Sequence, residues 1–237
     1  MKVIPVLLVF LLIGEAKAEI TDNKEIAGAW KTTFADGNTG ILVITEKHYS
    51  VAIFKEDPAV FVATHGGVLN RTRYQTTVTF EYNTMDESLI GKTISAVLHL
   101  SGGKLYVEGD TWERIDDGSP GKLAGAWLIT GIEREGEMRE IVPGARRTMK
   151  ILSGKYFQWI AYNVETKEFF GTGGGTYTSK EGKYIEEIGF FSRDNSRVGA
   201  SLEFDYELKD GDWHQRGKSS KGEPKYEIWS QRHKTGI

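Results

Sequence analysis

The sequence reads IAGAW at residues 26–30 and LAGAW at residues 123–127, so nearly the same phrase occurs twice in a chain of 237 residues. Each copy also ends on a tryptophan followed by an arginine, in TWER at 111–114 and IWSQR at 228–232. Self-similarity at a long interval is the signature of a repeated structural unit. The phrase and its ending therefore predict two copies of one unit.

The glycines between these phrases repeat their spacing. The interval from Gly66 to Gly91 equals the interval from Gly174 to Gly199. One match of this kind can arise by chance, but an ordered series of matches cannot. We therefore interpret the chain as an internal duplication.

The boundary between the two units lies in DDGSPGK at residues 116–122, a short polar stretch with Gly and Pro that is typical of a linker. We expect the first unit over residues 26–115 and the second over residues 123–232. The second copy is longer, and GIEREGEMREIVPGA at 131–145 accounts for most of the added length near its start.

Both units show the alternation of β-strands. TISAVLHL at 93–100 and SLEFDYEL at 201–208 place apolar side chains at every second position, which is the period of a half-buried strand. No stretch of the sequence after residue 18 has the pattern of a long amphipathic helix. We predict an all-β protein with two tandem small antiparallel up-and-down β-barrels, because closure removes the exposed edges of a meander. A single larger barrel, with half its strands from each copy, is the alternative.

The N-terminus has the pattern of a cleavable signal peptide. Lys2 precedes an apolar run over residues 3–13, and AKA follows at 16–18. The run is shorter than the roughly 20 residues that a membrane-spanning helix needs. We expect a signal peptide over residues 1–18, a secreted or periplasmic location, and no integral membrane segment after cleavage.

Composition excludes several kinds of chemistry. The chain has no cysteine, which removes thiol catalysis, Cys-ligated zinc and iron–sulfur clusters. The formal net charge of −3 gives no basic footprint for nucleic acid. None of the five histidines lies at a metal-ligand spacing, and no Gly-x-Ser-x-Gly elbow occurs. We predict no catalytic residue, no metal site and no cofactor.

The glycines of GTGGGTY at 171–177 and HGG at 65–67 indicate a bulge or sharp bend rather than a phosphate loop.

A family resemblance rests on the ends of each unit. Gly-x-Trp stands on the first expected strand at 28–30 and again at 125–127, and an arginine stands on the last strand as Arg114 and as Arg232, or Gln231 in its place. This combination with an antiparallel meander resembles the lipocalin-like, or calycin, β-barrel family.

The second unit, particularly residues 171–196, is similar to uncharacterised secreted bacterial proteins with lipocalin-like domains. In that family the tryptophan plugs the closed end of the barrel and the arginine lies across its ring. The resemblance implies that Trp30 with Arg114, and Trp127 with Arg232, close the two barrels. Such a cation–π contact contributes ~0.5–2 kcal/mol.

The candidate ligand surface lies in the second unit, where KYFQWIAY at 155–162 carries aromatic side chains on both faces of its strand. Ligand pockets are apolar and aromatic with a few polar groups. The predicted binding residues are Arg146, Arg147, Tyr156, Trp159, Tyr162, Tyr177, Tyr184 and Glu186. The alternative is that these aromatics fill their own barrel and that the arginines are solvated. By resemblance, residues 131–145 are expected to form a lid over the second unit.

The function expected from these patterns is the binding of a small hydrophobic or amphipathic ligand in the second barrel of a secreted protein. The alternative is a non-catalytic structural or interaction module, with filled barrels that contact a protein or glycan. A third reading is an isomerase- or cyclase-like enzyme on a calycin barrel, although no motif supports catalysis. Fold alone does not decide among these three.

Overall fold

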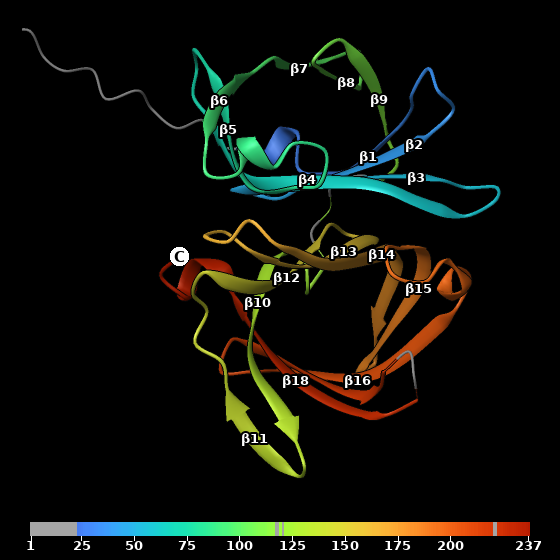
Figure 1. Cartoon of the computed structure of the whole chain (residues 1–237), viewed down its shortest axis with the longest axis vertical. Coiled ribbons are helices and arrows are strands. Elements are labelled where there is room, and N and C mark those ends of the chain that lie inside the picture. The colour runs from blue at the N-terminus through green and yellow to red at the C-terminus, as the bar shows by residue number, and fades with distance from the viewer. Residues whose placement is uncertain (1–22, 117–118, 120, 220–221) are drawn as a thin grey trace, which may run out of the picture.

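The computed structural model describes residues 23–116, 119, 121–219 and 222–237. The expected signal peptide over residues 1–18 lies outside the described residues, as do three positions of the expected linker. Two barrels are stacked along the long axis of the molecule (Figure 1). The helical elements of the described chain are short 3-10 turns.

The first barrel contains β1 (Gly28–Thr33), β2 (Thr39–Ile44), β3 (His48–Lys55), β4 (Val60–Arg71), β5 (Thr76–Asn83), β6 (Thr93–Ala96), β7 (Leu98–Ser101), β8 (Lys104–Val107) and β9 (Asp110–Arg114), with the turns η1 (Asn23–Glu25) and η2 (Glu87–Leu89). The second barrel contains β10 (Gly125–Arg134), β11 (Glu137–Glu140), β12 (Arg146–Leu152), β13 (Tyr156–Asn163), β14 (Phe169–Lys180), β15 (Lys183–Phe191), β16 (Ser201–Lys209), β17 (Asp212–Lys218) and β18 (Pro224–Gln231), with η3 (Asn195–Arg197) and η4 (Arg232–Lys234).

Each barrel is a separate antiparallel sheet. The second closes because β10 pairs with both β12 and β18. The first has the order β6-β5-β4-β3-β2-β1-β9-β8-β7 and is nearly closed, since β6 and β7 are consecutive segments separated by Val97. The prediction of two tandem antiparallel barrels is confirmed, and two separate sheets exclude the single larger barrel.

The glycine-rich stretches form the predicted bulges. The β4–β5 register shifts between Gly66 and Gly67, and the β14–β15 register shifts at the equivalent point before Gly175. A Cβ on Gly67 would lie 2.0 Å from the carbonyl oxygen of Thr79, and a Cβ on Gly175 would lie 2.0 Å from that of Glu187. The φ angle is +156° at Gly67 and +158° at Gly175. Only glycine fits these two positions.

Strand β13 packs on both faces, which explains its aromatic residues. Phe157 and Trp159 belong to or pack against the interior cluster of the second barrel. Ile160 and Tyr162 belong to a different cluster, which includes Tyr82 from the first barrel. The outward face of β13 is therefore an interface between barrels rather than a solvent-exposed surface.

A buried carboxylate fixes the interface between the barrels. Glu81 of β5 accepts hydrogen bonds from the Tyr162 hydroxyl at 2.9 Å and from Nη1 of Arg147 and of Arg232, each at 2.6 Å. A second donor of Arg232, Nη2, also bonds Glu81. Since Glu81 and Arg232 are both buried, this cluster ties the two units into one body.

The insertion at 131–145 extends β10 and adds β11 beside it. All four residues of β11 are exposed, and this hairpin projects away from the second barrel (Figure 1). The expected lid is therefore replaced by a protruding hairpin.

Candidate ligand-binding site in the second barrel

The matching registers of the two barrels identify an unusual residue inside the second. Trp30 on β1 lies opposite Leu42 on β2, and Trp127 on β10 lies opposite Lys150 on β12. Lys150 thus occupies an inward position that is apolar in the first barrel. It is 2 % exposed.

The partner of Lys150 occupies a second position of the same kind. On β4–β5 of the first barrel, Leu69 pairs with Val78; on β14–β15 of the second, Tyr177 pairs with Glu186. Glu186 therefore stands where the first barrel has the apolar Val78. The duplicated scaffold carries a charged pair in one copy and aliphatic side chains in the other.

Lys150 and Glu186 form a buried ion pair. The Lys150 Nζ donates to Glu186 Oε1 and to Gln215 Oε1, both at 2.8 Å. The ammonium also faces four aromatic rings, with distances to the ring centroids of 4.6 Å for Trp213, 4.8 Å for Tyr184, 5.0 Å for Trp229 and 5.9 Å for Phe204. Cation–π attraction is strongest where the cation is shielded from water.

Burial shapes the titration of this cluster. Loss of solvation lowers the pKa of Lys150, while the adjacent Glu186 carboxylate acts in the opposite direction. Burial and the same carboxylate raise the pKa of Tyr184 well above its ordinary value. Tyr184 is consequently a neutral phenol at physiological pH, and the ion pair and rings favour the charged form of Lys150.

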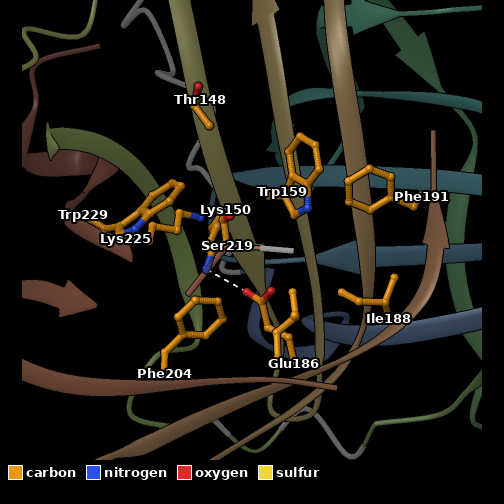
Figure 2. Close-up of a pocket in the computed structure, with 11 residues that line it drawn as sticks. Thr148, Lys150, Trp159, Glu186, Ile188, Phe191, Phe204, Ser219, Lys225 and Trp229 are labelled. Atoms are coloured by element: carbon orange, nitrogen blue, oxygen red, sulfur yellow. Dashed lines mark hydrogen bonds and ion pairs between the residues drawn. The ribbon is translucent and has the colours of Figure 1, made fainter. Parts of the chain in front are cut away.

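A cavity of about 180 Å³ opens beside the ion pair (Figure 2). The residues that line it are Thr148, Lys150, Trp159, Glu186, Ile188, Phe191, Leu202, Phe204, Ser219, Lys225 and Trp229. They come from β12, β13, β15, β16 and β18 and from the residue after β17, so the cavity is a hollow of the barrel interior. Its wall is mostly apolar and aromatic, with Lys150, Glu186, Ser219 and Lys225 as the main polar contributors.

The size of this cavity limits what it can hold. An apolar cavity of about 150 Å³ accommodates benzene, whereas drug-sized ligands occupy pockets of about 300–1,000 Å³. The hollow of the second barrel therefore suits a molecule of roughly one substituted aromatic ring.

The structure brings four of the eight predicted binding residues to the barrel interior. Trp159 and Glu186 line the cavity. Tyr177 and Tyr184 belong to the interior cluster, and the Tyr177 hydroxyl donates to the backbone carbonyl oxygen of Ser153 at 2.6 Å. These two tyrosines support the cavity from within the core.

The other four predicted residues lie away from the cavity. Arg147 and Tyr162 bind Glu81 between the barrels. Arg146 places its guanidinium 4.3 Å from the ring centroid of Phe170. Tyr156 packs against the cluster between the barrels. Arg147, Tyr156 and Tyr162 belong to the outward face of the β12–β13 hairpin, because strand neighbours alternate between the two faces. Arg146 has the parity of Lys150 but stands at the start of β12 and does not line the cavity.

The tryptophan closures differ between the two barrels. The Arg114 guanidinium lies 4.0 Å from the Trp30 ring centroid, as the family resemblance implies. In the second barrel the residue opposite Trp127 is Gln231, while Arg232 is turned towards Glu81. Arg232 is thus an interface residue rather than a barrel closure, because it begins the turn η4 after β18 and its guanidinium binds Glu81.

Sequence reasoning missed Lys150, the centre of the cavity's polar cluster. Two signals were present: Lys150 aligns with Leu42 of the first copy, and it shares a strand face with Leu152. Its partner Gln215 was also missed. Neither residue stands out by type, since most lysines and glutamines are exposed.

A larger hollow of about 660 Å³ lies between the barrels. Its walls come from turns and strand ends, including residues 45–48 of the first barrel and 152–154 of the second. Burial and the nearby Arg232 lower the pKa of His48 at its edge to about 3. This hollow is more polar than the cavity within the second barrel and is the other concave surface to consider.

Comparison with known proteins gives no direct lead, since neither a protein-family model nor a curated protein matches the chain. Over the residues that the structure describes, no helix is both long enough and apolar enough to cross a membrane. The same residues contain no group of three or more His, Asp or Glu side chains placed to hold a metal ion. A function for the chain has to follow from its own fold and cavity.

Proposed function

We propose that this protein is a lipocalin-like binding protein, secreted or periplasmic, whose second barrel holds a small and partly apolar molecule. The observation that carries the proposal is the cavity of about 180 Å³ with aromatic walls and a buried ion pair at its side. Apolar walls with a few convergent polar groups are the general character of ligand sites. The signal-peptide pattern over residues 1–18 supports secretion.

The buried ion pair supports binding because stability alone does not call for it. Replacing a buried ion pair with apolar side chains is often neutral or stabilising. The first barrel uses Leu42 and Val78 at these positions and folds as the same meander. Polar groups that line a cavity can orient a ligand, which gives the Lys150–Glu186 pair a role in binding.

Native mass spectrometry of the mature protein isolated from its own host tests the proposal. We expect an added mass of small-molecule size under native conditions that disappears on denaturation. Leu202→Phe fills the cavity and should remove the added mass. Ile94→Phe is the matched control, because Ile94 pairs with Val78 as Leu202 pairs with Glu186.

The outcomes separate the possible sites. An added mass that survives Leu202→Phe would place the ligand outside the cavity, with the hollow between the barrels as the next position to test. Equal native and denatured masses for the wild-type protein would count against a carrier role.

A protein-interaction module is the second candidate, and a different observation favours it. Around the break between β6 and β7, Val97 is 64 %, Ile94 39 % and Leu100 36 % exposed. Exposed apolar side chains beside strand ends are typical of surfaces that pair with another chain. A protein-sized added mass in the native spectrum, abolished by Val97→Lys and retained in Leu202→Phe, would favour this candidate.

A further inference from the structure

The charged side chains around the second-barrel cavity are already paired. Lys150 contacts Glu186 at 2.8 Å, and Lys225 contacts Glu227 at 3.0 Å on β18. Glu186 and Glu227 are both buried, so neither pair is well screened by water. The cavity therefore presents balanced charge to a ligand.

This balance disfavours an anionic ligand. A carboxylate placed beside Lys150 would also approach Glu186, and like charges repel strongly in a poorly solvated interior. It would have to displace Glu186 from Lys150 and leave that carboxylate buried without its cation. Losing one partner of a buried pair is strongly unfavourable.

A cationic ligand is disfavoured for a different reason. The rings of Trp213, Tyr184 and Trp229 surround one point, which is the arrangement that attracts an ammonium group. The Lys150 ammonium already occupies that point. A cationic ligand would be repelled by the Lys150 ammonium and would find no free aromatic cage.

The unpartnered groups that remain here include several hydrogen-bond donors. Trp229 lines the cavity, is 2 % exposed, and its Nε1 has no hydrogen-bond partner among the described residues. The Nε1 of Trp213 and the Nε2 of Gln215 are unpartnered in the same sense. Lys150 has three N–H donors, of which Glu186 and Gln215 accept two. Glu227 Oε2 is an unpartnered acceptor on the strand between Lys225 and Trp229.

We infer that the ligand of the second barrel is an uncharged molecule, about the size of one substituted aromatic ring, with an oxygen that accepts hydrogen bonds from Lys150 and Trp229. An ether, carbonyl or hydroxyl oxygen meets this requirement, and a hydroxyl would in addition donate to a carboxylate. The inference rests on the proposed binding function and names the ligand class for that same cavity.

A matched series of single-ring compounds tests the inference by isothermal titration calorimetry on the mature protein. Anisole carries an acceptor oxygen without charge, toluene lacks the oxygen, benzoate is an anion and benzylammonium is a cation. We expect anisole to bind about three- to tenfold more tightly than toluene, the gain of one net hydrogen bond. Benzoate and benzylammonium should bind more weakly than toluene.

Two variants locate the effect. Trp229→Phe keeps an aromatic wall but removes the Nε1 donor, so the advantage of anisole over toluene should shrink. The matched control is Trp112→Phe, since Trp112 lies opposite Leu105 in the first barrel as Trp229 lies opposite Trp213. Leu202→Phe should weaken binding of every compound in the series.

The failures of the two proposals are distinguishable. Tightest binding by benzoate or benzylammonium would overturn the inference about charge and leave the cavity as a binding site. Equal affinities for anisole and toluene would overturn the inference about the oxygen. Absence of binding by every compound, up to its solubility limit, would overturn the proposed binding cavity itself.

Discussion

The two barrels share their meander, their bulges and two tryptophan positions, Trp30 with Trp127 and Trp112 with Trp229, but they differ in the side chains that fill them. Leu42 and Val78 of the first barrel become Lys150 and Glu186 in the second. In addition, Val107 on β8 corresponds to Gln215 on β17, next to the equivalent residues Leu105 and Trp213. Lys150 donates to both Glu186 and Gln215, and each of these polar residues alone would be an expensive buried group. A duplicated scaffold can therefore acquire a polar site only when several inward positions change together.

The strands that form the walls of the two barrels differ as well. In the second barrel β16 runs without a break and pairs with β15 and β17. In the first barrel the same stretch is divided into β6 and β7 at Val97, whose backbone N–H donates to a Glu108 carboxylate oxygen at 2.8 Å. Behind the continuous wall, Lys150 and Glu186 are 2 % and 4 % exposed, so the charged pair lies in a poorly solvated setting.

The largest expected effect comes from giving the second barrel one residue of the first. Lys150→Leu leaves Glu186 buried without its cation, and we expect a loss of about 3–5 kcal/mol in the free energy of unfolding. The double variant Lys150→Leu with Glu186→Val reproduces the first barrel at these two positions and should recover most of that loss. Urea denaturation of both variants measures the difference. A double variant as unstable as the single one would show that the two positions are not energetically coupled.

The interface between the barrels gives the next effect. Glu81→Gln removes the carboxylate that accepts from Arg147 and Arg232, and we expect a loss of about 3–5 kcal/mol because two guanidinium groups lose their counter-ion. Glu56→Gln is a suitable control, since Glu56 pairs with Lys31 at an exposed site of the same barrel and should change stability by less than about 1 kcal/mol. Similar losses in the two variants, measured by urea denaturation, would contradict the structural role of Glu81.

The Glu81 carboxylate should make the protein less stable as the pH falls into the acid range. Burial alone would raise the pKa of Glu81, but the hydrogen bonds and charges of Arg232 and Arg147 lower it below the ordinary value of 4.5. Its stabilising contribution is therefore present above that ordinary value and is lost as pH falls through the lower folded-state pKa. Glu81→Gln should flatten the stability profile in this acid range.

Two histidines should make the stability of the first barrel depend on pH in a less acidic range than Glu81 does. Burial, followed by the charge of Arg232, lowers the pKa of His48 to about 3, and burial lowers that of His65 to about 4. Both are protonated first in the unfolded chain, so stability should decrease as pH falls below the ordinary value of 6.5. Each histidine lowers the free energy of unfolding by at most about 1.4 kcal/mol per pH unit.

His65→Phe checks the histidine prediction. The ring lies between Tyr49 and Phe80, with centroid distances of 5.9 Å and 5.7 Å, so phenylalanine suits its surroundings. The variant should lose less stability than wild type between neutral pH and pH values near 4. An unchanged profile would exclude His65 as a source of the acid sensitivity.

Much of the fold was predictable because it is local in the sequence. Strand alternation, the glycine bulges and the repeated Gly-x-Trp each follow from neighbouring residues and predict the two barrels. The docking of one barrel on the other was not predictable in this way. It recruits Arg147, Tyr162 and Arg232 to Glu81, and such a long-range contact leaves no periodic signal.

The candidate site was predicted only in part for a related reason. Trp159 and Glu186 were selected as aromatic and charged residues of the second unit, and both line the cavity. The Lys150 partner of Glu186 is 36 residues away in sequence, and a lone lysine in a strand ordinarily indicates solvent exposure. Alignment of the two copies, with Leu42 at the matching position, and the strand face shared with Leu152 mark Lys150 as an interior residue.

The smallest expected effect compares the closed ends of the two barrels. Arg114 lies over Trp30 and donates hydrogen bonds to the carbonyl oxygens of Ala27 and Glu25 at 2.8 Å and 2.6 Å. Arg114→Gln gives the first barrel the residue that the second has, and it should lower the free energy of unfolding by about 1–2 kcal/mol. Gln231→Ala should change it by only about 0.5 kcal/mol, because Gln231 supplies no cation to its tryptophan. Urea denaturation of the two variants tests the difference, and equal losses would mean that Trp127 depends on its strand partner as much as Trp30 does.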